Sequence, residues 1–149
     1  MAWRSLDSYE LITLLQQERI VRVAFCTEDE RYVVPLGFVW FDHNLWGTTR
    51  HGRKTAIAGR DNRVAFTIDD SASATPFQWR SVVGEGRFET VTPDVAAGAL
   101  SRFAEQFPDN PEWNVRDFVE GLADGSSTFW RIEPTDLAGR IHFDPDRPE

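Results

Sequence analysis

Cysteine and lysine are almost missing from this sequence of 149 residues, and histidine is scarce. The one cysteine, Cys26, rules out a disulfide framework, and the histidines at positions 43, 51 and 142 lack the spacing of metal ligands. We therefore expect no metal site. Cys26 stands in an apolar run, which favours a buried, unreactive thiol. Because there is neither an apolar leader nor a run long enough to cross a bilayer, we expect a cytoplasmic protein.

Positive charge is also in short supply, since 16 basic residues face 24 acidic ones and the formal net charge is −8. An acidic surface repels nucleic acid and anionic membranes, so we expect neither as a partner. The sequence is rich in aromatic residues, with 11 Phe and 6 Trp, which is ample material for one core. We predict a single domain over residues 1–149, with a charged tail at 144–149, that binds a small molecule.

The apolar residues recur mostly with the period of two that is typical of β-strands. Strands are predicted at 20–26, 32–40, 45–49, 64–68, 78–91, 128–132 and 137–143. Short helices are predicted from Asp7 to Leu15, at 54–59, from Pro93 to before Pro108, and at 113–122. Because turns link successive strands, the order predicts a mainly β fold with an antiparallel barrel, and Gly84 and Gly86 favour a bulge that helps it close. In the strand 32–40, Pro35 and Gly37 leave one face nearly bare, which indicates an edge strand or the close approach of another group.

Residues 50–63 hold five of the 16 basic residues, including Lys54, the only lysine. Arg53 and Lys54 lie where a short helix is predicted to begin, and the helix dipole disfavours cations there. A phosphate would reverse that effect, because it would meet free backbone N–H groups, a guanidinium and an ammonium, with hydroxyls from Thr48 or Thr49. The alternative is a solvated basic turn on the rim of the barrel.

A second cluster, at 78–81, places Trp79 and Ser81 on one face of a strand and Gln78 and Arg80 on the other. A planar ligand could meet the indole ring and nearby hydrogen-bonding groups, or Trp79 could simply belong to the core. No nucleophile, acid–base pair or other catalytic residue is evident.

Several short motifs, taken in order, are similar to those of a known superfamily. These are V-V-P-L-x-F at 33–38, T-T-x-x-G-R-K at 48–54, N-R-V at 62–64 and W-R-S-V-V-x-E-G-R at 79–87. Over about residues 5–143 the chain resembles the pyridoxamine 5′-phosphate oxidase-like, FMN-binding split-barrel superfamily, and within it the nitroimidazole-reductase-like branch.

This resemblance implies a six-stranded antiparallel split β-barrel and a homodimer with flavin sites at the subunit interface. By the resemblance, Arg53, Lys54 and Thr48 or Thr49 would bind the phosphate of FMN. The backbone of Val34, Pro35 and Leu36 would border the ring system, and Trp79, Arg80 and Ser81 would line the ring or the ribityl chain. Related branches use a deazaflavin, FAD or haem instead. Arg140 and His142 match the R-x-H spacing of a substrate region in the true oxidases, without the surrounding pattern.

The resemblance and the basic segment together favour an FMN-dependent oxidoreductase that acts on a small molecule. Such an enzyme needs no catalytic side chain of its own, because the isoalloxazine carries the electrons. Two alternatives remain open at this stage. One is a flavin-, deazaflavin- or haem-binding protein without turnover, and the other is a structural dimer without a cofactor.

Overall fold

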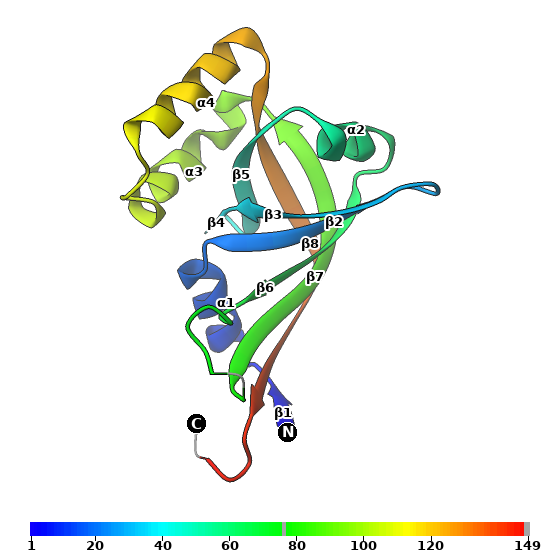
Figure 1. Ribbon diagram of the computed structural model, residues 1–149, viewed down its shortest axis with the longest axis vertical. Coiled ribbons are helices and arrows are strands. Elements are labelled where there is room, and N and C mark those ends of the chain that lie inside the picture. The colour runs from blue at the N-terminus through cyan, green and yellow to red at the C-terminus, as the bar shows by residue number, and fades with distance from the viewer. Residues whose placement is uncertain (76, 148–149) are drawn as a thin grey trace.

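The computed structural model describes residues 1–75 and 77–147, and the last two residues of the predicted tail lie outside these ranges. One curled antiparallel sheet forms most of the molecule (Figure 1). Its strands are β1 (Ala2–Ser5), β2 (Ile20–Cys26), β3 (Arg31–Gly37), β4 (Val39–Phe41), β5 (Asn44–Arg50), β6 (Arg63–Asp69), β7 (Trp79–Val91) and β8 (Ser127–Phe143). They are ordered β3-β2-β6-β7-β8-β5-β4, with β1 added to β8. This confirms the predicted mainly β split-barrel fold.

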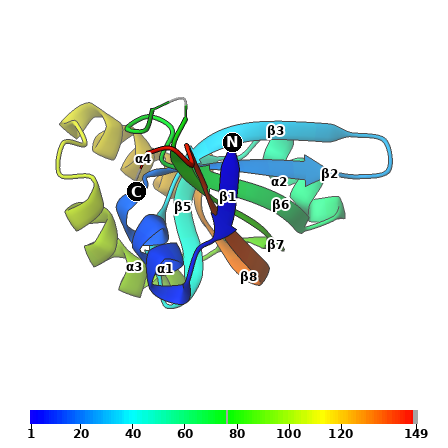
Figure 2. The same ribbon diagram turned by 90° about the horizontal axis from the view of Figure 1, so that it is seen from below.

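Four short helices accompany the sheet: α1 (Ser8–Gln17), α2 (Arg53–Arg60), α3 (Pro93–Gln106) and α4 (Glu112–Asp124). Their ends follow the expected local signals. Asp7 caps α1 by accepting a hydrogen bond from the backbone N–H of Glu10 at 2.8 Å, and Pro93 occupies the first turn of α3. Figure 2 shows α1, α3 and α4 on one side of the sheet, with the β2–β3 hairpin projecting on the other.

The alternation of apolar residues determines which face of each strand is inside. In β2, Val21, Val23 and Phe25 are fully buried, whereas the residues between them are partly or fully exposed. The barrel interior is built around Phe25, Phe88 and Trp130. A second core packs α3 and α4 against the back of β4 and β5, and it contains the side chains of Val39, Trp46, Ala96, Ala99 and Phe129.

The barrel is split between β3 and β5. β3 is hydrogen-bonded to β2 on one side only, and β5 pairs with β4 only as far as Trp46. The two strands touch at one point, where a Cβ atom added to Gly47 would lie 2.7 Å from the carbonyl oxygen of Gly37. Beyond that junction, no ladder within the described residues joins β3 to the last residues of β5. The prediction that the strand containing Pro35 is an edge strand is therefore confirmed.

Several details differ from the sequence-based prediction. The strands predicted at 128–132 and 137–143 are one 17-residue strand, because a bulge at Glu85/Gly86 lets the β7–β8 ladder continue past Pro134. The short strands β1 and β4 raise the count above the six expected. Cys26 is exposed, contrary to prediction, because the period of two that buries Phe25 turns its neighbour outward. None of the helices in the described part of the chain is long and apolar enough to cross a membrane.

Candidate functional site

The short helix α2 lies at one end of the barrel, beside the β2–β3 hairpin (Figure 1). Ile57 anchors it in the barrel core and is fully buried. Arg53 and Lys54 occupy the first turn, as predicted. The N-cap residue, Gly52, has no side chain to cap the helix, and the Thr55 hydroxyl accepts a hydrogen bond from the Gly52 N–H at 2.9 Å. Because the first N–H groups of a helix have no carbonyl partner within it, α2 presents free donors and a partial positive charge together with these two cations.

Four of the five cations in the basic segment already have carboxylate partners. Arg50 pairs with Asp117 at 2.5 Å and Arg63 with Asp61 at 2.8 Å, while Arg53 and Arg60 both contact Glu30. The Arg63 pair holds the pKa of Asp61 at about 2. Lys54 has no acidic partner among the described residues.

Lys54 is half-buried, and burial lowers the pKa of its ammonium below the ordinary value of 10.5. A partly desolvated cation without an internal counter-ion is destabilised unless an anion binds to it. Among the predicted phosphate ligands, Lys54 is therefore the one whose surroundings most favour that role.

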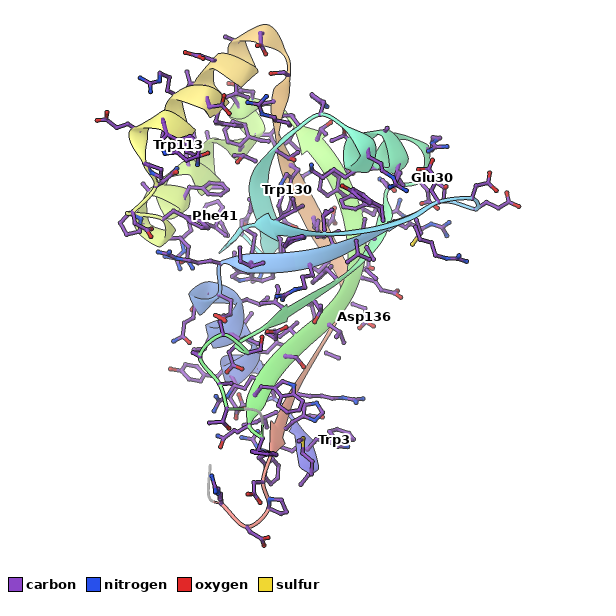
Figure 3. The ribbon with its side chains drawn as sticks, viewed as in Figure 1. Trp3, Glu30, Phe41, Trp113, Trp130 and Asp136 are labelled. Atoms are coloured by element: carbon purple, nitrogen blue, oxygen red, sulfur yellow. The ribbon has the colours of Figure 1, made fainter. Side chains whose placement is uncertain are left out.

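Arg53 has a different environment. Its guanidinium lies 4.6 Å from the centre of the Tyr32 ring, and its Nε is 3.6 Å from the Glu30 carboxylate. Glu30 reaches this position from the tip of the β2–β3 hairpin and also hydrogen-bonds to Arg60, as its place beside α2 in Figure 3 shows. The Arg60 contact, with a smaller contribution from Arg53, lowers the pKa of Glu30. An anion that binds at this end of α2 would therefore compete with the Glu30 carboxylate for Arg53.

Replacing Glu30 by glutamine should strengthen the binding of a flavin phosphate. Loss of the carboxylate frees Arg53 and Arg60, and we expect the affinity for FMN to rise about 3- to 10-fold. This increase corresponds to a fraction of the free energy of one charge-assisted hydrogen bond. Fluorescence titration of FMN against the two proteins measures the change. Glu28→Gln, an exposed neighbour in the same hairpin, is the control, and an equal effect in both variants would contradict the competition.

Thr48 and Thr49 lie on opposite faces of β5. Thr49 faces the barrel side, and its hydroxyl donates to the carbonyl of Arg50 at 3.3 Å. Thr48 faces α3 and α4, where it lines two cavities of about 380 and 460 Å³. We call these cavities together the β5 groove. The two side chains therefore point to opposite sides of the strand, although both residues border the cavity of about 380 Å³.

The predicted border of the ring system, Val34 to Leu36, lies on the free edge of β3. The side chains of Val34 and Leu36 pack against the barrel core, and Pro35 points outward. Backbone groups on this edge have no strand partner. Together with the unpaired end of β5 and the first turn of α2, this edge surrounds the split in the barrel.

The third group of predicted residues lies far from the split. Trp79 is opposite His142 on β8, whereas Thr48 is opposite Phe129 on the same strand. Thirteen residues of extended chain separate those two positions, which corresponds to about 40 Å. A single chain therefore places Val34, Pro35, Leu36, Thr49, Arg53 and Lys54 around the split and Thr48 on the opposite face of β5. Trp79, Arg80 and Ser81 are not part of this arrangement.

Trp79 and Ser81 share the outer face of the sheet, as the alternation predicts. The indole ring of Trp79 stacks on His142 with the ring centres 4.7 Å apart. Arg80 points to the other face, where it pairs with Asp70 at 3.5 Å. The guanidinium of Arg140 lies 4.3 Å above the ring of Trp3, which is near Trp79 on the neighbouring strand pair.

No cluster of possible metal ligands occurs in the part of the chain that the structure describes. Sequence reasoning missed Glu30, Asn110 and Asn114. Glu30 pairs with Arg60 across 30 positions, which no local pattern reveals. The two asparagines are four residues apart, and this spacing, at the start of a predicted helix, was a usable signal.

Comparison with known proteins agrees with this geometry. The model of the pyridoxamine 5′-phosphate oxidase family matches residues 7–141. The chain belongs to this family. No curated protein matches it in sequence.

Several solved structures share the fold of this family member. An FAD-binding protein from Mesorhizobium loti is 26% identical, with a TM-score of 0.72, covering 95% of this chain and 99% of the other. A candidate 5-nitroimidazole antibiotic resistance protein from Bacteroides thetaiotaomicron is 16% identical (TM-score 0.70, 95% and 89% covered). The haem storage protein HutZ of Vibrio cholerae is 14% identical (TM-score 0.67, 87% and 92% covered). The last two likenesses, below 25% identity, show the fold alone.

Proposed function

We propose that this protein is a flavin-dependent oxidoreductase that binds FMN at the split between β3 and β5. The observation that carries the proposal is Lys54, a half-buried ammonium with no acidic partner among the described residues, in the first turn of α2. A phosphate at this position would receive the charge of Lys54 and the free N–H groups of the helix. Family membership supports a flavin, and the FAD-binding relative makes FAD the nearest alternative to FMN.

The chain's own residues would bind and orient the cofactor. Lys54 holds the phosphate, and the free edges of β3 and β5 offer backbone donors and acceptors to the polar rim of a flat ring. When bound, an isoalloxazine supplies hydride or electron transfer. The junction of Gly37 and Gly47 closes the lower end of the split and would fix how deeply a ring can enter.

A second candidate function is cofactor binding without turnover. The likeness to a haem storage protein favours it. Absorption of the freshly purified protein, with the mass of the extracted ligand, separates flavin from deazaflavin and haem. Reduced nicotinamide added without oxygen should bleach the flavin of an oxidoreductase, whereas persistent colour with every donor tried would favour storage.

We also propose that the protein acts as a homodimer formed through the outer face of the sheet. This face carries a hollow of about 490 Å³, mostly apolar in its lining, and Val33 and Val83 there are 66% and 52% exposed. Large exposed apolar patches typically mark interfaces. Trp79 and Ser81 share this face, so a partner could supply them to a site that one chain leaves incomplete.

Val83→Glu should break this dimer. Burying an unpaired carboxylate, near Glu85 and Asp136 in the same hollow, costs several kcal/mol, so we expect the dimer Kd to rise at least about 100-fold. Light scattering during size-exclusion chromatography measures the mass. Val119→Glu places the same charge at a similarly exposed valine on α4 and should leave the dimer intact. A dimer that survives Val83→Glu but not Val119→Glu would place the interface elsewhere.

A further inference from the structure

The β5 groove is a second cavity beside the proposed flavin site. Its two parts share Thr48 and four residues of α3, α4 and the turn between them, namely Phe103, Asn110, Asn114 and Val115. The cavity of about 460 Å³ also contacts Gly37, so this part of the groove reaches the junction of β3 and β5 where the split closes. Its volume of about 460 Å³ is ample for a single aromatic ring with its substituents.

The groove is aromatic and carries no unpaired charge among its described lining residues. The rings of Phe103 and Phe107 lie nearly parallel, 29° apart, with their centres separated by 6.3 Å. The charged lining residues Arg50 and Asp117 pair with one another. Arg19, whose guanidinium lies 5.1 Å from the centre of the Phe107 ring, pairs with Asp109 at 3.3 Å. The lining therefore favours a flat, neutral molecule over an anion.

Asn110 and Asn114 give the groove directionality. The side-chain N–H of Asn114 donates to the side-chain oxygen of Asn110 at 2.6 Å. Each carboxamide keeps unused capacity, because Asn114 still offers its oxygen as an acceptor and Asn110 its NH₂ as a donor. The free donor and the free acceptor of this pair complement another carboxamide, which offers one group of each kind.

We propose that the β5 groove binds a flat, neutral ring bearing a primary carboxamide, as the dihydronicotinamide end of a reduced hydride donor does. This inference rests on the proposed flavin function, because a hydride donor must lie beside the flavin. Thr48 and Gly37 line the groove and place it next to the site where the flavin ring would lie. The phenylalanine rings would hold the ring, and Asn110 with Asn114 would hold its carboxamide.

Equilibrium binding tests this without turnover. Benzamide, nicotinamide and benzoate are titrated into apoprotein and FMN-loaded protein while the side-chain amide NMR signals of Asn110 and Asn114 are followed. Benzamide and nicotinamide should shift these signals. Benzoate should bind at least about 10-fold more weakly, because it has a charged carboxylate oxygen in place of the NH₂ donor of benzamide. Asn114→Leu should weaken benzamide binding about 10-fold, whereas Glu120→Gln, at an exposed position of α4, should change nothing.

Equal binding of benzoate and benzamide, or unchanged benzamide binding in a folded Asn114→Leu protein, would overturn the carboxamide site. Loss of benzamide binding once FMN is loaded would also overturn it, because the groove would then belong to the flavin itself. A protein that binds benzamide but no flavin would support the groove and refute the proposed function, so the two failures are distinguishable.

Discussion

Lys54→Ala should weaken FMN binding about 10- to 150-fold. A hydrogen bond from a charged donor contributes about 1.5–3 kcal/mol, and each 1.4 kcal/mol is a factor of ten in Kd. Lys54 has no acidic partner to release in the part of the chain that the structure describes, so the substitution removes the full interaction with the phosphate. Isothermal titration of apoprotein with FMN measures the effect.

The arginine beside it provides an internal comparison. Arg53→Ala should have a smaller effect, because the guanidinium is already shared with Glu30 and packed on Tyr32. Arg63→Ala should have almost none, since that side chain is paired with Asp61. If Lys54→Ala binds FMN as well as the unaltered protein does, the assignment of the phosphate to α2 is wrong.

The pH dependence of binding gives Lys54 a second signature. Burial makes the free protein's Lys54 lose its proton below the ordinary value of 10.5, whereas a bound phosphate would raise the pKa again. FMN affinity should therefore fall as the pH rises through the lowered pKa, and this fall should be absent in Lys54→Ala. The folding stability of the free protein depends on pH with the opposite sign. Between the lowered pKa and 10.5 the unfolded chain binds one more proton at Lys54 than the folded chain does, so folding stability rises with pH.

Gly47→Ala should destabilise the fold by about 3 kcal/mol, the upper end of the usual cost of overpacking a core. The added Cβ would lie 2.2 Å from Cζ2 of Trp130 and 2.7 Å from the carbonyl oxygen of Gly37. Trp130 is fully buried in the barrel core, where it stacks on Phe88 with the ring centres 5.4 Å apart, and Figure 3 labels it beside β5. Urea unfolding, followed by tryptophan fluorescence, measures the loss.

Gly59→Ala is the matched control. A Cβ on Gly59 would meet nothing within 4 Å, and alanine is the better helix former inside α2 by about 0.5–1 kcal/mol. This substitution should therefore stabilise the protein slightly. Similar losses in both variants would mean that the crowding at the junction of β3 and β5 is not the cause.

The parts of the fold that depend on local chemistry could be predicted from the sequence. The alternation in β2 and β3, the Asp7 cap and Pro93 all act over a few residues, and the elements that they predict are present. The separation of Trp79 from Lys54 could not be predicted in this way. It follows from the length of β8, which depends on one bulge that keeps β7 and β8 in register around Pro134.

The contacts of the candidate site could not be predicted from the sequence either, because they also join distant parts of the chain. The sequence indicated that the basic segment was unusual, but not that Glu30, Asp61 and Asp117 neutralise four of its five cations. Two of those carboxylates come from distant elements, so only the folded chain singles out Lys54. Cys26 is exposed and not buried as predicted, because the continuous apolar run around it does not reveal which residues face outward.

The position of Pro35 affects how the protein behaves in a crowded solution. An unpaired strand can recruit a strand from another molecule and so start aggregation. Proline lacks the N–H that such pairing needs, and it is tolerated in β3 because its nitrogen faces away from β2. The row of donors along this margin is therefore interrupted midway, which discourages a foreign peptide while leaving shorter stretches of backbone accessible to a small ligand.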